Sequence, residues 1–358
     1  MSESQNRLAV VGVSPPPFGG VSVHVSREIE LLRNAGIDVS LFEQTGKSDR
    51  DNQVFPLSSS KLAFFRFLLK VDYDLIHFHF ANHTASALTG LVLHFRKKQR
   101  YMATVHGEGL LENYARRGFV FKKLVSIYFC NAAHVVGVNQ NVTDFLEQTI
   151  GVEPRKVSLI PAFLPPTAKE LDSSNIPAAV SEFTKGKTHL IGTHGWFGFF
   201  RPEGVHVYGF DMLCRIAEEI SQSGKNIGMY TVISGVYDEE HRREILAVQE
   251  KYKDHWLIVE TSFTCASLYK KTSLFLRPTS TDGDSVSIRE CLALGVPVLA
   301  SDAVPRPAAC ELFRSRDFDH FSERFWQMCG SDNDKVERQV EAFDNDLLSV
   351  IRSVLDDT

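Results

Sequence analysis

The sequence predicts an α/β protein built from two doubly wound domains, and three observations carry this prediction. Short apolar runs alternate with helical patterns along most of the chain. A proline-containing stretch of low periodicity divides this alternation into two series. The length of 358 residues also suits two domains of roughly 100–200 residues each.

The first series opens with residues 8–13 (LAVVGV), a continuous apolar run typical of a strand buried on both faces. The loop SPPPFGG follows, and apolar residues then recur at helical spacing until Gly36, which we expect to end the helix. Asn139 is expected to cap a helix that ends near Gly151. Further strands are expected at 39–42, 75–80, 101–105, 134–138 and 157–160.

The stretch 161–187 contains four prolines and little periodicity, and it predicts an interdomain linker. Strand-like runs of the second series lie at 189–193, 229–233, 256–259, 274–276 and 296–300. The resulting division is a first domain at 1–163, a linker at 164–187, a second domain at 188–334, and a last helix at 335–358 able to pack back on the first domain. Ligands of such sheets bind at the carboxyl ends of the strands, so we expect a cleft where two sheets face each other.

Composition narrows the class of protein. The N-terminal MSESQNR is polar and predicts no secretory signal, and no apolar run approaches the roughly 20 residues that span a bilayer. The six cysteines form no CxxC pair, which favours reduced thiols and a cytoplasmic location. Residues 1–170 carry 19 Lys and Arg against 15 Asp and Glu, whereas 171–358 carry 20 against 29. This mild asymmetry gives no case for nucleic-acid binding.

The segment richest in chemistry is 277–301, RPTSTDGDSVSIRECLALGVPVLAS. A strand ends just before it, and Asp284 or Ser285 can cap a helix that begins near Val286. Gly295 can end that helix in the left-handed conformation. The helix N-terminus would then offer free N–H groups to a phosphate or pyrophosphate. Glu290, little more than one turn into the helix, can accept hydrogen bonds from a ribose diol; the alternative is a solvated glutamate on a surface helix.

This segment resembles the C-terminal signature of glycosyltransferase family 4, retaining enzymes with the GT-B fold of two Rossmann-like domains facing a cleft. The family has two glutamates separated by seven residues, followed by a GxPVxxS run. Here Asp282 stands in place of the first glutamate, and Glu290 is followed by LALGVPVLAS. The resemblance implies that Glu290 binds the nucleotide ribose and that Asp282 contacts sugar hydroxyls or stabilises the developing oxocarbenium charge.

The N-terminal motif VVGVSPPPFGGVSVHV is similar to the family's strand, Gly-Gly loop and helix. Gly19 and Gly20 would allow the backbone to approach a ligand; the alternative is a flexible loop with a tight turn. The motif is not a GxGxxG fingerprint, which argues against a dehydrogenase.

Two histidine-containing strand ends also resemble the family: DLIHFHFANH at 74–83 and ATVHGEG at 103–109. The resemblance implies that His106 faces the donor sugar; a structural role is the alternative. His77 and His79 share one strand face because alternate residues point the same way. They suit metal ligation, but no third ligand is evident in the sequence and GT-B enzymes generally need no metal. We therefore expect core or cleft-wall roles and no metal or other cofactor.

The start of the second domain departs from the family. Tyr208–Gly209 stands where Lys–Gly is usual, and the usual arginine beside Gly195 is missing. A departing diphosphate needs positive charge, which arginine supplies bidentately. Arg201 and Arg277 are the candidates. The expected donor-binding residues are Gly19, Gly20, Arg201, Arg277, Gly283, Asp284, Ser285, Val286 and Glu290, and the expected catalytic residues are His106, Asp282 and Glu290.

The resemblance implies transfer of a sugar from a UDP- or GDP-sugar to a hydroxyl acceptor, with retention of configuration. The acceptor would be a glycan or lipid-linked glycan of a cell-surface polysaccharide. A sugar-nucleotide epimerase and a non-catalytic binding protein of GT-B fold are the alternatives.

Basic residues interleave with apolar ones in KLAFFRFLLK (61–70), FRKKQR (95–100, with Phe95) and FVFKKLVS (119–126). This pattern fits a peripheral contact with the inner face of the plasma membrane. Core-facing amphipathic helices with solvated Lys and Arg are the alternative.

Overall fold

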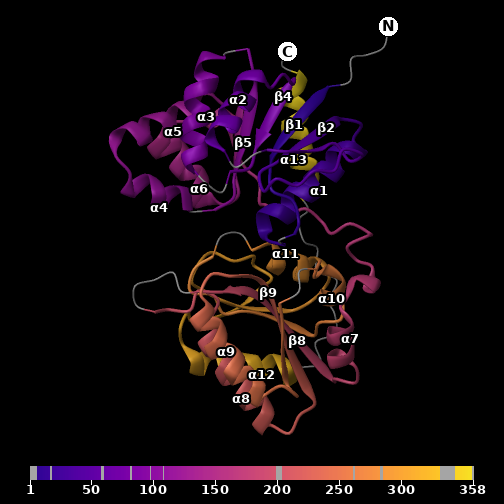
Figure 1. Cartoon of the computed structure of the whole chain (residues 1–358). Helices are drawn as coiled ribbons and strands as arrows, with labels where there is room; N and C mark the ends of the chain where they lie inside the picture. The colour runs from indigo at the N-terminus through magenta and orange to yellow at the C-terminus, as the bar shows by residue number, and fades with distance from the viewer. Residues whose placement is uncertain are drawn as a thin grey trace. The chain divides into compact units, whose positions relative to one another are not determined.

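The computed structural model describes residues 6–16, 18–57, 60–80, 83–96, 98–107, 109–198, 204–260, 263–282, 285–330 and 343–356. These residues form two compact units. Unit 1 comprises the described residues within Met1–Pro15, Gly19–Leu164 and Ala342–Thr358, and unit 2 those within Pro16–Phe18 and Pro165–Glu341. Each unit is one layered α/β body with its own sheet (Figure 1).

Unit 1 is built on a parallel sheet with the strand order β3-β2-β1-β4-β5-β6-β7. Its described strands are β1 (Arg7–Gly12), β2 (Asp38–Glu43), β3 (Val54–Pro56), β4 (Leu75–Phe78), β5 (Tyr101–Val105), β6 (His134–Gly137) and β7 (Val157–Leu159). The order reverses between β1 and β4, which places a topological switch point at their carboxyl ends. β4 and β5 are buried along their whole length, as their apolar runs predict.

Helices cover both faces of this sheet. They are α1 (Gly20–Asn34), α2 (Lys61–Lys70), α3 (His83–Phe95), α4 (Gly109–Arg116), α5 (Phe119–Asn131), α6 (Gln140–Asp144), the π-helix η1 (Phe145–Ile150), the 3-10 helix η2 (Pro154–Lys156) and α13 (Asp344–Asp356). Asn139 caps α6 by accepting a hydrogen bond from the Val142 amide at 2.9 Å, and Gly151 ends η1 with φ +87°, which confirms both predictions.

The C-terminal helix α13 packs within unit 1 (yellow beside indigo in Figure 1). Its buried face, which includes Leu347 and Ile351, joins the core cluster formed by β1 and α1. The last described helix therefore closes the face of the first sheet that α1 covers.

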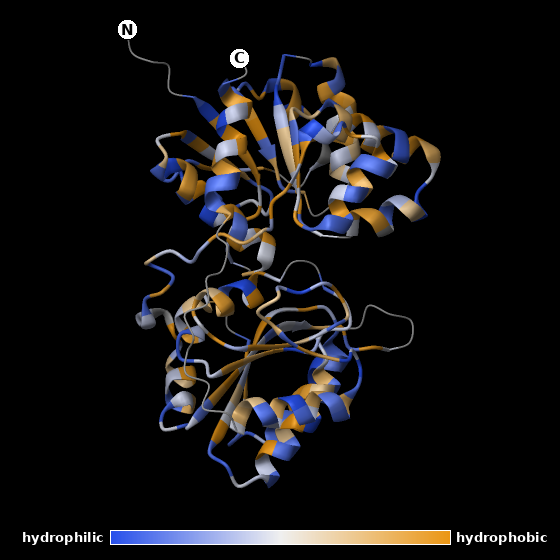
Figure 2. Ribbon diagram, turned by 180° about the vertical axis from the view of Figure 1, so that it is seen from behind, coloured by the Kyte–Doolittle hydropathy of each residue, from blue (hydrophilic) through white to orange (hydrophobic). Residues whose placement is uncertain are grey.

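Unit 2 carries a second parallel sheet with the order β10-β9-β8-β11-β12-β13. Its described strands are β8 (His189–Phe197), β9 (Ile227–Val236), β10 (Trp256–Val259), β11 (Leu274–Arg277), β12 (Val298–Ser301) and β13 (Glu311–Phe313). Its described helices are η3 (Ser173–Asn175), α7 (Ala178–Thr184), α8 (Phe210–Gln222), α9 (Glu239–Lys251), α10 (Ala266–Tyr269), α11 (Val286–Ala293) and α12 (Phe318–Gly330). Figure 2 shows that apolar residues line the strands while the outer helices are mixed.

The structure differs from the sequence prediction at the segment 164–187. It holds η3 and α7. All of its residues except the first, Leu164, belong to unit 2. Val180 of α7 is buried in a cluster with Leu190 and Tyr230, so this segment is packed structure. Short helices such as α7 offer too few residues for a periodic signal.

Candidate active site

Arg277, the last residue of β11, is the centre of a charged cluster at the carboxyl end of the unit 2 sheet. Its Nε donates to Asp282 Oδ2 at 2.8 Å, and its Nη2 donates to Asp282 Oδ1 at 2.9 Å. Its Nη1 donates to the His194 carbonyl at 2.9 Å. The pair is thus a bidentate arginine–carboxylate bridge, the strongest common geometry for these groups.

A second arginine, Arg306, completes this cluster. Its Nη1 donates to Asp282 Oδ2 at 2.8 Å and its Nη2 donates to Thr279 Oγ1 at 2.7 Å. Sequence reasoning missed Arg306, although it follows the end of β12 by only five residues, and loops at strand carboxyl ends are where ligands bind. Two guanidinium groups around one carboxylate leave this end of the sheet with an excess of positive charge.

Asp282 is ionised in this setting. Burial alone raises the pKa of its carboxyl, but Arg277 and then Arg306 outweigh burial and hold the pKa below its usual value. Both of its oxygens accept hydrogen bonds from arginines, and contact of this carboxylate with a sugar stays a prediction.

Helix α11 begins beside this cluster. Ser285 is its N-cap residue, although its side chain does not cap the helix, and Val286 is the first helical residue. The first turn holds no acidic residue, so its N–H groups and positive end can receive an anion. Gly295 ends the region with φ +71°, which confirms the left-handed position. Gly283, Asp284 and Arg201, three of the expected donor-binding residues, lie outside the described residues.

Glu290 lies inside α11 and is only 7% exposed. The alternative of a solvated surface glutamate is therefore wrong. Its charge helps to raise the pKa of the Cys291 thiol, after burial, which is the larger cause. A buried carboxylate one turn from a helix N-terminus is suited to accept hydrogen bonds from a hydroxyl-bearing ligand.

Tyr208 and Gly209 occupy the position of the missing Lys–Gly pair. The Arg277 guanidinium lies 4.9 Å from the centre of the Tyr208 ring, a cation–π contact. Gly209 has φ +63°, and a Cβ atom there would lie 2.2 Å from the Pro278 carbonyl oxygen. The turn therefore requires glycine, and the tyrosine supports the arginine from one side.

The carboxyl end of the unit 1 sheet carries a cluster of histidines around Glu28 of α1. His77 Nδ1 lies 2.6 Å from Glu28 Oε1, and His79 Nε2 lies 2.9 Å from Glu28 Oε2. His77 and His79 therefore share one face, as the strand alternation predicts. Among the described residues, the ion pairs of Glu28 are all with histidines.

His106 follows β5 and joins the same cluster. Its Nε2 lies 2.9 Å from His79 Nδ1, and its ring centre lies 5.0 Å from that of His24. Burial, then His24 and His79, lower the pKa of His106 well below its usual value, so the ring is neutral at pH 7. The pKa of His79 is lowered to about 4, chiefly by burial.

Two sets of side chains in this cluster are close enough to share a metal ion. They are His24, His79 and His106, and Glu28, His77 and His79, with ligand atoms within 4.8 Å of one another. The third ligand that the sequence did not reveal comes from α1 or from the end of β5. Neutral imidazoles of this kind are common ligands of zinc.

Gly19 and Gly20 lie at the start of α1. The Gly19 amide donates to Ser22 Oγ at 3.0 Å, which satisfies one of the N–H groups at the helix start. A Cβ atom on Gly19 would find no atom within 4 Å, so the position opens on free space. The loop can admit a ligand here.

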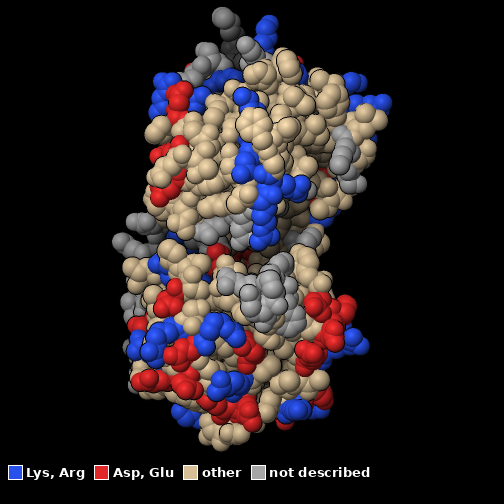
Figure 3. Space-filling model, turned by 90° about the vertical axis from the view of Figure 1, so that its left-hand side faces the viewer, with Lys and Arg blue, Asp and Glu red and all other residues tan. Residues whose placement is uncertain are grey.

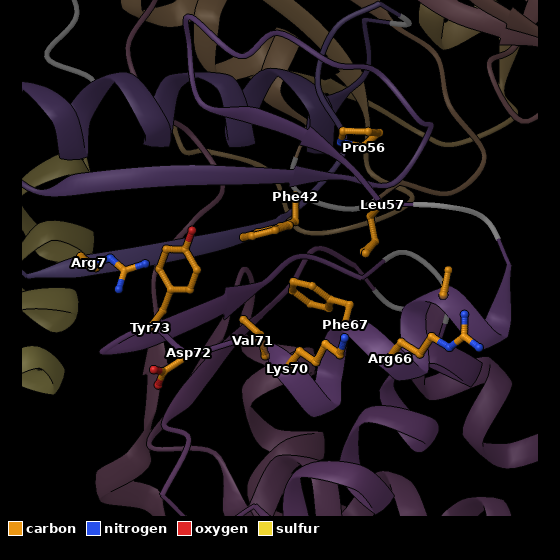
Figure 4. A pocket seen from close by; sticks show the side chains of 11 residues that line it. Arg7, Phe42, Pro56, Leu57, Arg66, Phe67, Lys70, Val71, Asp72 and Tyr73 are labelled. Carbon is orange, nitrogen blue, oxygen red and sulfur yellow. The ribbon is translucent and has the colours of Figure 1, made fainter.

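A separate hollow of about 540 Å³ lies in unit 1 beside α2. Figure 4 shows Phe42, Leu57 and Phe67 inside it, with Arg66 and Lys70 at its edge and the Arg7 guanidinium over the Tyr73 ring. None of the expected catalytic residues lines it. It is an apolar hollow with a basic border.

Two doubly wound parallel sheets define the architecture of this chain, and solved structures show that the fold is GT-B. A sucrose-phosphate synthase from Thermosynechococcus elongatus has a TM-score of 0.70 at 16% identity, covering 99% of this chain and 100% of that chain. HepE from Anabaena, in complex with UDP and glucose, has a TM-score of 0.65 at 13% identity, covering 98% and 96%. A Listeria monocytogenes protein assigned as a UDP-N-acetylglucosamine 2-epimerase has a TM-score of 0.67 at 13% identity, covering 99% and 98%.

Residues 18–167 match the model of Glycosyltransferase Family 4, which confirms the resemblance to that family. The matched residues fall in the N-terminal part of the chain, whereas the signature quoted above lies at 277–301. No curated protein matches the chain significantly. Among the described helices, none is long and apolar enough to cross a membrane.

Proposed function

We propose that this protein is a glycosyltransferase that moves a sugar from a nucleoside diphosphate sugar, UDP- or GDP-linked, to a hydroxyl acceptor with retention of configuration. The observation that carries the proposal is the cluster at the end of the unit 2 sheet: two arginines, a helix N-terminus and a buried glutamate. These groups match a diphosphate and a ribose in charge and hydrogen-bonding capacity.

Each residue has a role in this proposal. Arg277 and Arg306 stabilise the charge of the departing diphosphate, and the N-terminus of α11 receives one of its phosphates. Glu290 binds the ribose. Asp282 acts as a positioning residue that holds both guanidinium groups. His106 contacts a sugar hydroxyl or the reacting centre, and no metal ion is needed for these contacts.

The test is a panel of UDP-, GDP- and ADP-sugars, measured by thermal stabilisation of the wild type and of Glu290→Ala. A shift of several degrees with one nucleotide, lost in the variant, supports the proposal. Ser223→Ala, at the C-cap residue that follows α8, is a matched control that should retain the shift. No shift with any donor in the wild type counts against the proposal.

Product analysis separates transfer from epimerisation. Epimerisation is the second candidate because the similar Listeria structure is assigned as an epimerase. Incubation with donor alone releases a changed sugar or free nucleotide if the protein is an epimerase. Transfer requires an acceptor, and the anomeric configuration of the product, read by NMR coupling constants, tests retention. A binding protein without activity would show the thermal shift and no product in either assay.

The acceptor proposed is a glycan or a lipid-linked glycan, reached at the inner face of the plasma membrane. Figure 3 shows a face of unit 1 on which Lys and Arg lie among uncharged side chains. Phe119 and Val120, at the start of α5, are 78% and 71% exposed, next to the exposed Arg116 and Arg117. Exposed apolar residues beside basic ones favour contact with anionic lipid.

A further inference from the structure

Glu28 is a fully buried carboxylate whose ion-pair contacts with the described residues are all to histidines. Burial raises the pKa of this carboxyl, but His77 and His79 outweigh it, and the pKa lies well below its usual value. Glu28 is therefore a carboxylate and can only accept hydrogen bonds. The nitrogen atoms that face it must supply the hydrogens.

The protons of the two neighbouring rings follow from this requirement. His77 Nδ1, 2.6 Å from Glu28 Oε1, carries a hydrogen, and His77 Nε2 lies 2.8 Å from Thr104 Oγ1. His79 Nε2 lies 2.9 Å from Glu28 Oε2 in an ion-pair contact, and His24 Nε2 lies 3.4 Å from the same oxygen. A lone pair on His79 Nε2 would face the negative carboxylate oxygen at this distance, so this nitrogen carries the proton. In the neutral ring, His79 Nδ1 then bears a lone pair.

The ring that follows His79 in this series of contacts is His106. Its Nε2 lies 2.9 Å from His79 Nδ1, so the proton between them belongs to His106 Nε2. If His79 Nδ1 donated to His106 Nε2 instead, His79 would carry hydrogen on both nitrogens and be an imidazolium. Burial disfavours that charge, because His79 is only 1% exposed. The remaining nitrogen of His106, Nδ1, is left with a lone pair.

His24 completes the surroundings of this cluster. Its Nδ1 lies 2.9 Å from the Ala162 carbonyl oxygen and donates to it, and its Nε2 lies 3.4 Å from Glu28 Oε2. The His79–His106 nitrogen separation of 2.9 Å fits a hydrogen bond. Two ligands of a tetrahedral zinc ion lie about 3.3 Å apart, from bonds of about 2.0–2.1 Å. A zinc ion shared by these two nitrogens would require them to move apart from their present 2.9 Å.

We propose that Glu28, acting through His79, holds His106 in the tautomer with hydrogen on Nε2, so that His106 Nδ1 accepts a hydrogen bond from a substrate hydroxyl. Glu28 and His79 are positioning residues, and His106 is the residue that touches the substrate. This inference rests on the proposed function for the identity of the substrate. The tautomer itself is a property of the free protein.

The experiment is NMR of the full-length protein labelled with ¹⁵N-histidine at pH 7.5. Two-bond ¹H–¹⁵N correlations report which ring nitrogen carries hydrogen, and His106→Gln assigns the resonance. We expect hydrogen on Nε2 and a bare Nδ1 for His106. Hydrogen on Nδ1, an imidazolium, or stoichiometric zinc in the purified protein would overturn the proposal.

Two variants separate positioning from packing. His79→Phe keeps a ring but removes the link, and we expect His106 to exchange between tautomers. His77→Phe is the matched control: it also loses a bond to Glu28, yet His77 does not contact His106, so the His106 tautomer should persist. An unchanged tautomer in His79→Phe overturns the proposal. If that variant does not fold, the wild-type spectrum still decides.

Activity then links the tautomer to the substrate. In His79→Phe we expect kcat to fall on the order of 10-fold while donor-induced thermal stabilisation is retained. A wrong assignment of the function would remove donor stabilisation in the wild type and leave the NMR result intact. The two failures are therefore distinguishable.

Discussion

The guanidinium of Arg277 holds the carboxylate of Asp282 through two hydrogen bonds of 2.8 and 2.9 Å. The arginine ends a strand, and the aspartate lies five residues further along the following loop. This pair ties the loop that leads into α11 to the sheet beneath it. Because Arg306 binds the same carboxylate, Asp282 holds both Arg277 and Arg306 in place.

Asp282→Asn should destabilise unit 2 by about 3 kcal/mol, because it leaves two buried guanidinium groups without their counter-charge. Urea unfolding at pH 7.5 measures this loss. Asp211→Asn is the matched control, since the Asp211–Arg316 pair is about one-third exposed and should contribute within about 1 kcal/mol. Equal losses in the two variants would contradict a special role for Asp282.

Arg306→Ala should weaken binding of the preferred nucleotide sugar by on the order of 10-fold or more, because a charge-assisted contact to phosphate is lost. Isothermal titration calorimetry measures the affinity. Arg306→Lys keeps the charge but not the two-pronged geometry, and we expect an intermediate affinity. If Arg306→Ala binds donor as the wild type does, Arg306 only supports Asp282.

Gly209→Ala should destabilise the protein by about 3 kcal/mol or more, because a backbone with φ +63° is combined with a Cβ atom 2.2 Å from the Pro278 carbonyl oxygen. Gly224→Ala is the matched control: its φ is +66°, but a Cβ atom there meets nothing within 4 Å. We expect that variant to lose only about 1–2 kcal/mol. Thermal unfolding of both variants separates the clash with Pro278 from the cost of placing alanine in a left-handed backbone conformation. Similar losses of stability in the two variants would contradict the clash.

Stability should fall as the pH is lowered from about 6.5 towards 4. The folded protein keeps His79 neutral, with a pKa of about 4 against an ordinary value of 6.5, so the unfolded chain binds more protons in this window. The lowered pKa of Glu28 adds a further loss below about 4.5, where the unfolded carboxyl becomes protonated first. Each histidine of this kind contributes at most about 1.4 kcal/mol per pH unit. Urea unfolding at pH 7.5, 6.0, 5.0 and 4.5 tests the trend, and a constant free energy of unfolding would refute it.

The protein should bind anionic liposomes at low salt and release them as the salt concentration rises. Co-sedimentation measures the bound fraction. The variant Phe119→Ser/Val120→Ser/Arg116→Gln/Arg117→Gln should lose most of this binding, because its apolar and basic contacts are removed together. Arg243→Gln/Lys251→Gln, on exposed positions of α9 in unit 2, is the control that should bind normally. Absence of binding at every salt concentration would exclude the membrane contact.

Much of the framework was predictable because it depends on neighbours in the chain. The apolar runs of β1 and β5, the cap at Asn139 and the left-handed turn at Gly295 each follow from a few adjacent residues. The position of Glu290 after a strand–loop–helix start was predictable for the same reason. The structure places Glu290 inside α11, little more than one turn from its start, as predicted, and shows that it is buried.

The pairing of side chains was decided only by the tertiary structure. Arg306 reaches Asp282 across 24 residues, and His77 reaches Glu28 across 49. Sheet order brings these residues together, because β11 and β12, or β1 and β4, become neighbours only when the helices between them have packed. Local patterning determines where strands and helices begin and end, whereas the packing of distant elements determines which buried charge meets which partner. The sequence alone therefore placed most candidate residues near strand ends. The fold determined that Asp282 binds two arginines and that Glu28 contacts a cluster of histidines.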